Sequence, residues 1–386
     1  MNRQFDIAVI GGGPVGAALA LALHGSRLRI CVLEARPADV PSRDARALAL
    51  SYGSRLLLSR LGIWDALQEI SSIRTIHISQ QRSFGQTLLH AEELDVTALG
   101  YVLPYPVLQH AMTQALHGSD IEIFNSAIVT QLDHTADHVQ IDYQQDGTVH
   151  ALQARLAVVA DGGKLLEQKY PPAMHDYGQS ALITHVTCAA PRAETAFERF
   201  TPQGPLALLP YKDGYELVWT APHQRAQEML QWDDAEFLLQ LHAQFGDRVG
   251  EFKSAGTRAC FPLSLKRALQ QSPMPRTVLL GNAAQTMHPV AGQGFNLGLR
   301  DAWELAQVVH DSNVDALGSE AMLAAYRNSR RSDREAAIRF TDGLVRLFSN
   351  DWPLLDTARA AALTALDCLP FAKKFVARRM MFGANG

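Results

Sequence analysis

Short apolar runs separated by small or polar residues mark the first third of the chain and predict alternating strands and helices. Residues 5 to 10 (FDIAVI) and Leu28 to Leu33 have the aliphatic and β-branched content of buried parallel strands. The small-residue stretch from Val15 to Leu23 lies between them and predicts a helix, which completes a βαβ unit. Apolar residues at helical spacing predict two more helices, from Ser51 to Trp64 and from Pro106 to Leu116.

The pattern then changes to short alternating runs, which predict antiparallel strands. Such runs fill the segment from Ile121 to Val159, where an Asp-Gly pair at 146 and 147 indicates a hairpin. After Pro171 and Pro172, the runs ALITHV, AFERF, LALLP and YELVW predict a second, antiparallel β-domain that ends near Pro262. The buried-strand pattern returns at 277–281 (TVLLG), and helical spacing dominates from Phe295 onward.

These patterns predict an α/β fold: a Rossmann-like nucleotide-binding domain with an inserted antiparallel β-sheet substrate domain and C-terminal helices. The first segment lacks the last strand of such a domain and TVLLG supplies one, so we expect a discontinuous domain. The expected boundaries are 1–170 for the first part of the nucleotide-binding domain, 171–262 for the β-domain, 263–350 for the second part with its helices, and 351–386 for a helical tail.

Composition and charge narrow the function classes. With 386 residues, of which 47% are hydrophobic, the chain can bury a large core, and its net charge of -4 offers no basic surface for nucleic acid. Its four cysteines lie far apart without metal-ligand spacing, so neither a metal site nor a disulfide framework is indicated and a cytoplasmic location is expected. We find no signal peptide and no run of about 20 apolar residues, so any membrane contact is expected to be peripheral.

A glycine-rich turn between the first strand and the first helix carries the first chemical signal. Gly11, Gly13 and Gly16 match G-x-G-x-x-G, in which the glycines allow a tight turn, backbone approach to a pyrophosphate and close helix packing. Glu34 ends the second strand, where an acidic side chain accepts hydrogen bonds from an adenosine ribose. An ordinary loop is the alternative, but the flanking strand, helix and acid favour recognition of ADP. NAD and FAD enzymes share these features.

Residues 281 to 301 (GNAAQTMHPVAGQGFNLGLRD) decide between these cofactors, because they resemble the second FAD motif of the single-component flavin-dependent aromatic hydroxylases. Asn282 and Gln285 stand where most of that family has Asp and His. This form resembles the branch that hydroxylates 2-octaprenyl-6-methoxyphenol in ubiquinone synthesis. The stretches 196–210 and 330–350 also resemble that branch, and the similarity covers nearly the whole chain, being weakest after about residue 351.

The resemblance implies that FAD is bound and suggests which residues hold it. Asn282 is expected to hydrogen-bond a ribityl hydroxyl, and the turn at 292–294 leads into a helix whose N-terminus would stabilise the anion of reduced flavin. Arg46, Gln109 and the pair at 161 and 162 match further cofactor positions of the family. The expected cofactor-binding residues are therefore Gly11, Gly13, Gly16, Glu34, Arg46, Gln109, Asp161, Gly162, Asn282, Gly292, Gln293, Gly294, Phe295 and Asn296.

Some of these matches leave alternatives open. The family usually has Ser where Leu165 stands, and the surroundings of Gln109 (LPYPVLQ) depart from its Glu-Asn pattern. An Asp-Gly pair is often an ordinary turn, and Arg46 could be a solvated charge. The glycine turn at 292–294 could simply cap a structural helix.

His288 and Pro289 are the expected catalytic residues, as the wall of the reaction chamber beside the flavin ring. We expect Phe200 and the LALLP strand to lie near an apolar substrate pocket, with plain core packing as the alternative. His185, His288 and Tyr211 are conceivable bases for a phenol, although isolated residues of these types are more often structural.

The resemblance further implies a cycle in which NADH or NADPH reduces FAD, O2 adds to give a C4a-hydroperoxide, and oxygen passes to a polyprenylated phenol. Other quinone-synthesis proteins are conceivable partners. Alternatives are FAD-dependent hydroxylation or reduction of another aromatic or isoprenoid substrate, and a non-catalytic scaffold. The tail from Cys368 to Gly386 has four cations, no acid and interleaved apolar residues, so it could rest on an anionic membrane or pack as an ordinary helix.

Overall fold

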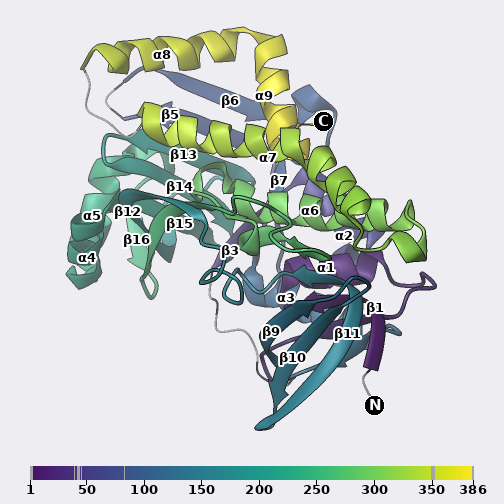
Figure 1. Ribbon diagram of the computed structural model, residues 1–386. Helices are drawn as coiled ribbons and strands as arrows, with labels where there is room; N and C mark the ends of the chain where they lie inside the picture. Colours follow the sequence, from purple (N-terminus) through teal and green to yellow (C-terminus); the bar gives the residue numbers. More distant parts are fainter. Residues whose placement is uncertain are drawn as a thin grey trace.

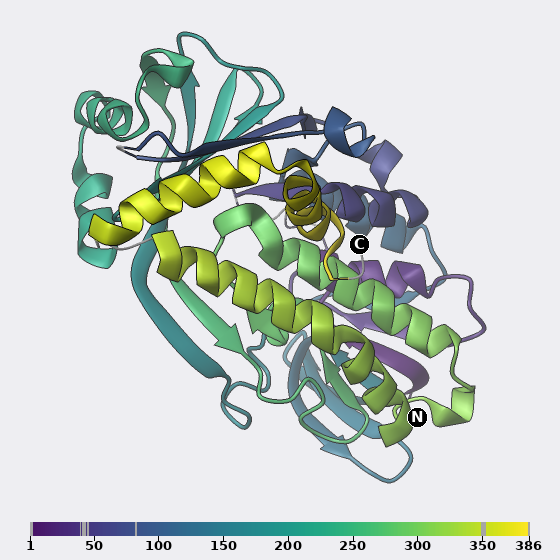
Figure 2. The same ribbon diagram turned by 90° about the horizontal axis from the view of Figure 1, so that it is seen from above.

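The α/β fold predicted from the sequence is confirmed by a computed structural model, which describes residues 3–38, 40, 44, 46–81, 83–348 and 353–384. Figure 1 shows a lower part, built on the sheet that contains β1, β9, β10 and β11, and an upper part, built on the sheet that contains β5 and β12 to β15. Helices α6 and α7 connect the two parts, and they run side by side in Figure 2. None of the described helices is both long and apolar enough to cross a membrane.

The lower sheet combines a parallel core with an antiparallel edge. Its described strands, in spatial order, are β8 (Glu122–Phe124), β2 (Ile30–Leu33), β1 (Arg3–Ile10), β11 (Thr148–Val159), β10 (Val139–Gln145) and β9 (Ile128–His134), with β18 (Thr277–Leu279) also paired to β11. β1 and β2 consist mainly of buried aliphatic residues, which suits strands covered on both faces. The turn from β10 to β11 has positive φ at Asp146 and Gly147, as expected for the Asp-Gly hairpin.

β11 joins the two parts of the discontinuous nucleotide-binding domain into one sheet. Its N-terminal residues 148–154 pair antiparallel with β10, whereas Ala157 to Val159 pair in parallel with β18. β18 is the strand predicted from TVLLG, and it returns to the sheet after the whole β-domain has been traversed. The carboxyl ends of β1, β2, β11 and β18 therefore lie together at one edge, where open α/β sheets bind ligands.

The upper sheet contains more strands than those predicted for the inserted segment 171–262. Its described strands, in spatial order, are β19 (Gln285–Thr286), β17 (Ala259–Arg267), β12 (Ala173–Cys188), β15 (Gly214–Pro222), β14 (Gly204–Tyr211), β13 (Thr195–Thr201), β5 (Thr75–Gln80) and β6 (Gln86–His90), with β16 (Phe252–Ala255) paired to β12. β5 and β6 come from the segment expected to belong to the first part of the nucleotide-binding domain. β5 joins through a parallel pairing with β13, a long-range contact that local periodicity does not encode.

A small antiparallel sheet and the helices complete the fold. The small sheet has the order β3 (Ala47–Ser51), β7 (Gly100–Pro104), β4 (Ser71–Ile73). The described α-helices are α1 (Pro14–Ala22), α2 (Tyr52–Arg60), α3 (Tyr105–His117), α4 (His223–Gln231), α5 (Asp234–Phe245), α6 (Gln293–His310), α7 (Glu320–Phe348), α8 (Pro353–Cys368) and α9 (Pro370–Phe382). Short 3-10 helices occur at Trp64–Ala66, Glu92–Leu94, Asp247–Val249, Gly281–Ala283, Val290–Gly292 and Val314–Ala316.

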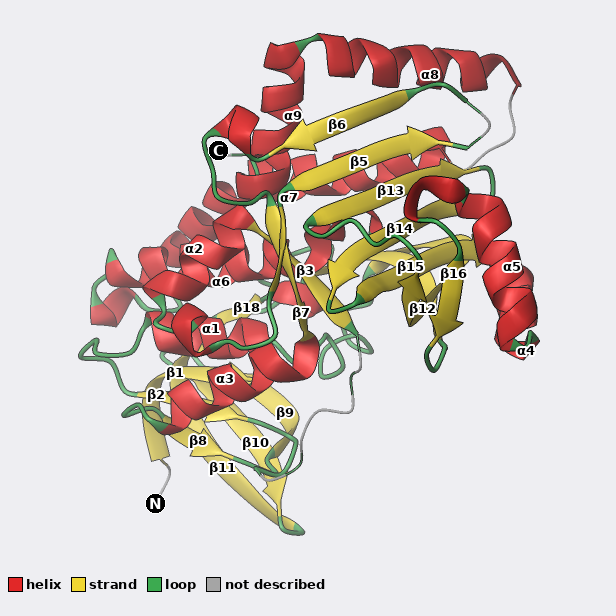
Figure 3. Ribbon diagram, turned by 180° about the vertical axis from the view of Figure 1, so that it is seen from behind, coloured by secondary structure: helices red, strands yellow, loops and turns green. Residues whose placement is uncertain are grey.

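The two faces of the upper sheet have different partners. One face packs on α4 and α5 through a core that includes Phe197, Trp219, Phe237 and Phe245, and Figure 3 shows these helices beside the sheet. Toward the other face lie α7 and α8, with α8 packed along β6 and α7 against β14. Because strand side chains alternate between faces, residues two apart on β13, β14 and β15 point toward this second side.

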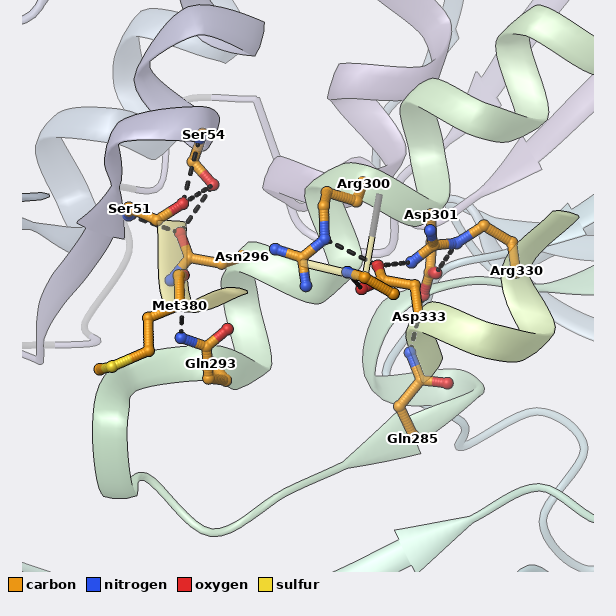
Figure 4. A network of polar contacts seen from close by, with 11 residues as sticks. Ser51, Ser54, Gln285, Gln293, Asn296, Arg300, Asp301, Arg330, Asp333 and Met380 are labelled. Carbon is orange, nitrogen blue, oxygen red and sulfur yellow. Dashed lines mark hydrogen bonds and ion pairs between the residues drawn. The ribbon is translucent and has the colours of Figure 1, made fainter. Parts of the chain in front are cut away.

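A buried ion cluster fixes α6 against α7. The guanidinium of Arg330 donates to Asp301 at 2.7 Å and to Asp333 at 2.8 Å, and the side chains of Arg330 and Asp301 are 1% and 0% exposed. Arg300 also donates to Asp333, at 2.8 Å, and Gln285 donates to the second oxygen of Asp301 at 2.7 Å. Burial alone would lower the pKa of Arg330, but the two carboxylates raise it above its ordinary value. Figure 4 shows the cluster lying between the two helices and the strand that carries Gln285.

Replacing one anion of this cluster should destabilise the fold strongly. We expect Asp301→Asn to lower the free energy of unfolding by about 3–5 kcal/mol, because the charge of Arg330 stays buried with less compensation. The shift of the urea midpoint, followed by tryptophan fluorescence, measures the loss. The matched control is Asp315→Asn: its carboxylate pairs with Arg155 at 3.1 Å but is 96% exposed, so a loss below about 1 kcal/mol is expected. Equal losses in the two variants would contradict a structural role for burial.

Candidate active site

A large cavity lies at the carboxyl ends of the parallel strands, with a volume of about 1080 Å³. Both glycine-rich turns line it, although Gly13 and Gly292 are 279 residues apart in the sequence. Among the residues expected to bind the cofactor, those lining the cavity are Gly11, Gly13, Glu34, Arg46, Asp161, Gly162, Asn282, Gly292, Gly294 and Phe295. The structure therefore brings most of the predicted set together around one space large enough for a dinucleotide.

The first turn has the backbone that its glycines predict. Gly11 has φ +104°, and a Cβ added there would lie 2.6 Å from the carbonyl oxygen of Ala160. A Cβ on Gly16 would lie 2.0 Å from the carbonyl oxygen of Gly11, so Gly16 lies behind the cavity and lets α1 pack against the turn. A Cβ on Gly13 would meet no protein atom within 4 Å, because this position faces the open cavity. A ligand can therefore approach the backbone most closely at Gly13.

α1 offers its N-terminus to this space. Its N-cap is Gly13, no side chain caps it, and Pro14 occupies the first turn. The free N–H groups and the positive end of the helix dipole favour an anion such as a pyrophosphate. One oxygen of Glu34 accepts from the N–H of Gly12 at 2.7 Å and the other from Arg36 Nε at 2.9 Å. These bonds hold the carboxylate at the cavity wall.

α6 presents a second N-terminus without a side-chain cap to the same cavity. Gly292 is its N-cap, with φ +60° and no side-chain cap. Asn296 does not line the large cavity: its side chain accepts from the N–H of Ser51 at 2.8 Å and donates to the carbonyl oxygen of Ala49 at 2.9 Å. Gln293 also faces away, donating to the carbonyl oxygen of Met380 at 3.2 Å. Figure 4 shows both side chains tying the start of α6 to neighbouring elements.

Two other predicted residues support turns. Gln109 is buried and donates to the carbonyl oxygen of Gly12 at 3.1 Å, so it braces the first turn from behind and lies outside the cavity lining. Asp161 lines the cavity while accepting from the N–H groups of Gly163 and Leu165, both at 2.8 Å. The Asp-Gly pair is therefore a structured turn at the cavity wall. Arg46 also lines the cavity and pairs with Asp44.

A second cavity of about 340 Å³ adjoins the first one. Aliphatic and aromatic residues from the upper sheet, α7, α8 and α9 form most of its lining, including Phe200, Ala207, Leu344, Leu363 and Val376. Five residues line both cavities and form the border between them: Ala49, Leu209, Val218, Pro289 and Gly292. Phe200 and two residues of the LALLP strand, Ala207 and Leu209, thus line an apolar space next to the predicted flavin site.

His288 and Pro289, the two residues expected beside the reaction chamber, differ in whether they line a cavity. Pro289 lies at the border, whereas His288 lines neither cavity. The imidazole of His288 is 1% exposed, lies 5.3 Å from the ring of Tyr177, and accepts from the N–H of Val290 at 3.1 Å. Burial lowers the pKa of His288 to about 4. His288 therefore packs in the protein core as a neutral side chain and does not form a wall of either cavity.

The other conceivable phenol bases also point elsewhere. The hydroxyl of Tyr211 donates to Glu69 at 2.7 Å, and burial raises its pKa to about 12. His185 contacts Glu216 and Asp213 at 3.1 and 3.3 Å, and these two carboxylates, Glu216 foremost, raise its pKa. Neither residue lines either of the two cavities described above. The ionisable residue that does line the apolar cavity, Glu198, was missed from the sequence; its place in the alternating run AFERF was the available signal, since Ala196, Glu198 and Phe200 share one face.

The larger cavity fits FAD. An extended ligand with an anionic centre suits this space, because two helix N-termini without side-chain caps, 279 residues apart in the sequence, face it. There is also open space at Gly13, Gly162 and Gly294, and hydrogen bonds hold the carboxylate of Glu34 in place. Residues 4–341 match the family model described as an FAD binding domain.

Comparison with known proteins agrees with this fit. An uncharacterized protein of Synechocystis sp. (slr1300) is 35% identical over 100% of this chain and 94% of its own length. The 3-demethoxyubiquinol 3-hydroxylase of Escherichia coli is 32% identical over 95% of each chain. The crystal structure of p-nitrophenol 4-monooxygenase from Pseudomonas putida has a TM-score of 0.80 at 18% identity, covers 100% of both chains, and shows the same fold. The chain belongs to the FAD binding domain family and is an FAD-dependent aromatic-ring monooxygenase, for which NADH or NADPH is the typical reductant.

Proposed function

We propose that this monooxygenase hydroxylates the ring of a polyprenylated phenol in ubiquinone biosynthesis, with 2-polyprenyl-6-methoxyphenol as its substrate and NAD(P)H and O2 as co-substrates. One observation carries the proposal: an apolar cavity adjoins the flavin cavity through a border that includes Pro289. A phenol ring at this border would leave a hydrocarbon chain in the apolar cavity. The relative from E. coli acts, by its name, on a ubiquinol precursor, which supports a substrate of this kind.

The same proposal assigns the cofactor residues. The N-terminus of α1 at Gly13 would hold the pyrophosphate, Glu34 the adenosine ribose, and Asn282 the ribityl chain. The N-terminus of α6, beginning at Gly292, would face the flavin ring and stabilise its anion. When bound, FAD supplies the redox chemistry, taking two electrons from NAD(P)H and activating O2, of which one atom enters the ring and the other leaves as water.

The chain's own residues orient the substrate and exclude water. Phe200 stacks on Phe348 of α7, with ring centroids 4.0 Å apart, and both rings line the cavity. Val376 and Met380 of α9 add apolar walls. Burying a hydrocarbon chain against such walls contributes about 0.8 kcal/mol per CH₂ group, so the tail can supply binding energy while the ring reacts. A dry chamber also prevents loss of activated oxygen to water.

Gly13→Ala should separate cofactor binding from folding. The added methyl group points into empty space, so we expect the apoprotein to keep its thermal midpoint. It would hold the pyrophosphate away from the backbone, so the Kd for FAD should rise at least about 10-fold, equivalent to 1.4 kcal/mol. Fluorescence titration of the apoprotein with FAD measures the change. The control Gly147→Ala alters a hairpin turn outside the cavity and should leave the Kd unchanged.

A chain-length series tests the substrate. Product formation from 2-prenyl-6-methoxyphenols with one, two and three isoprene units should show a KM that falls with length, because each added unit buries more apolar surface. Ala362→Trp, at a position that lines the cavity, should raise KM for the longest compound more than for the shortest. Ala361→Trp places the same ring one residue earlier, on an exposed position outside the lining, and is the matched control. A KM independent of length, or no hydroxylated product, would refute the proposal.

We also propose that α9 places the enzyme on an anionic membrane surface, where a polyprenyl substrate resides. Phe371 and Phe375 are 73% and 61% exposed, and the exposed cations Lys374 and Arg378 lie beside them. Exposed aromatic rings flanked by cations suit the headgroup region of an anionic bilayer. The opposite side of the helix is buried and lines the apolar cavity, so the segment also has the packed role expected as the alternative.

Because α9 is part of the cavity wall, point substitutions test membrane binding better than deletion of 368–386. The double variant Phe371→Ser/Phe375→Ser should bind vesicles of phosphatidylglycerol at least about 10-fold more weakly, since two exposed rings no longer insert. Vesicle co-sedimentation measures binding. Leu239→Ser removes an apolar side chain that is 63% exposed on α5 and should bind like the wild type. Equal binding of the double variant would exclude this surface.

A further inference from the structure

We propose that the carboxylate of Glu198 accepts the phenolic proton of the substrate and is a catalytic residue of the hydroxylation. This inference rests on the proposed phenol substrate and adds a residue that contacts its hydroxyl group. Glu198 is the ionisable residue among the described residues that line the apolar cavity.

The sheet register places Glu198 in the middle of an apolar floor. It lies on β13, with Ile78 of β5 opposite on one side and Ala207 of β14 on the other. Val218 of β15 continues the same row beyond Ala207 and belongs to the border with the flavin cavity. Two strand spacings of about 4.8 Å separate Glu198 from Val218 across the small side chain of Ala207. A phenol ring over Ala207 would have one edge toward the flavin cavity and its hydroxyl toward Glu198.

Glu198 has no hydrogen-bond or ion-pair partner among the described residues, although bordering the cavity leaves it partly accessible. Thr220, on the same floor, is 1% exposed, and its hydroxyl also lacks a partner within the protein as described. Natural proteins rarely leave such groups unsatisfied, and each instance requires an explanation. For Glu198, a polar group of the substrate in a mostly apolar pocket is the explanation that fits.

Charged groups on the neighbouring elements face elsewhere. Arg199 and His77 point to the opposite face of the sheet, where they contact the carbonyl oxygen of Gln244 and the side chain of Gln86. On α7, Asp342 pairs with Arg346 and accepts from Tyr177. On α8 and α9, Asp367 and Lys373 pair with each other, and Lys373 also pairs with Glu93. None of these groups lines the cavity, so the surroundings of Glu198 are set by burial alone.

This isolation has a chemical consequence. Burial raises the pKa of Glu198 to about 7. A base is most effective when its pKa lies near the working pH, where it is available unprotonated and still accepts a proton readily. The same residue at the protein surface would be far too weak a base for a phenol.

The proton step balances within the substrate and this one side chain. The O–H bond of the phenol breaks, its electron pair stays on oxygen, and an O–H bond forms on the Glu198 carboxylate. The phenolate is a more electron-rich ring, which favours transfer of the electrophilic oxygen atom supplied by the flavin reaction. The hydroxylated ring carbon then loses its hydrogen as a proton, which leaves in the water formed from the second oxygen atom of O2. As the ring becomes aromatic again, Glu198 returns its own proton to the phenolate oxygen. The carboxylate is then ready for the next substrate.

Thermal unfolding of the holoenzyme tests the titration without any turnover. An acid whose pKa is higher in the folded than in the unfolded state favours folding below its unfolded value of 4.5, and that stability is lost as the pH rises through about 7. Glu198→Gln should therefore have a higher Tm than the wild type at pH 8, with a clearly smaller difference at pH 5. Glu194→Gln removes an exposed carboxylate just before the same strand and should show no such pH dependence. A Glu198→Gln difference that is equal at both pH values would overturn the inference.

Kinetics test the role itself. With 2-prenyl-6-methoxyphenol, wild-type kcat/KM for hydroxylation should fall as the pH drops below about 7. Glu198→Gln should lower kcat/KM by about 10²–10⁴-fold at pH 8 and abolish its fall below pH 7. Glu198→Asp should keep this pH dependence, with a lower kcat/KM. Product from Glu198→Gln at the wild-type rate and pH profile would disprove the inference while the proposed function stands. If the wild type forms no product, both the proposed function and the catalytic role of Glu198 are refuted, whatever the thermal data show.

Discussion

The start of α6 must be held still, because it separates the two cavities on which any reaction depends. Asn296 secures the first turn to β3 and α2, and the buried cluster of Arg330, Asp301 and Asp333 secures the rest of the helix to α7. Charges buried to this degree tolerate little displacement, since separating them leaves an uncompensated charge away from water. The rigidity of the border around Pro289 follows from these contacts, some of which lie about two helical turns further along α6.

Because the start of α6 is fixed, a polar cavity and an apolar cavity can lie side by side in one fold. The flavin cavity is lined by backbone N–H groups and fixed carboxylates, which suit phosphates and hydroxyls. The adjoining cavity is mostly apolar: among its polar lining residues in the described chain, Ser51, Gln293 and Asn296 have hydrogen-bond partners within the protein, whereas the carboxylate of Glu198 and the hydroxyl of Thr220 have none. Five residues line both cavities, so under the proposed function a ring at this border would meet the flavin while its substituents stay in hydrocarbon surroundings. The placement of α7, α8 and α9 over the sheet would exclude water from a substrate bound in this cavity.

The sequence predicted what local patterns encode. The glycine turns, Glu34 and the returning strand at 277–279 are recognisable because spacing and backbone conformation determine them. Gln109 and His288 illustrate the limit: both lie in motif-like stretches, yet one braces a turn and the other is buried core, a choice made by packing between distant segments. The contribution of β5 and β6 to the upper sheet depends on a pairing across more than 100 residues. The alternating run AFERF indicated only that Glu198 shares a strand face with apolar residues; that this face lines a cavity depends on the helices packed over the sheet.

The parallel pairing of β5 with β13 affects whether the inserted segment can be exchanged between proteins as a unit. The upper sheet looks like a cassette inserted into a nucleotide-binding domain, but its far edge is built from chain that precedes the insertion. A graft of 171–262 into a related scaffold would therefore arrive without the strands beneath α8, and the recipient would have to supply a matching edge. Substrate range in this architecture can thus change gradually through side chains on both segments, whereas exchange of the inserted block as a unit is structurally obstructed.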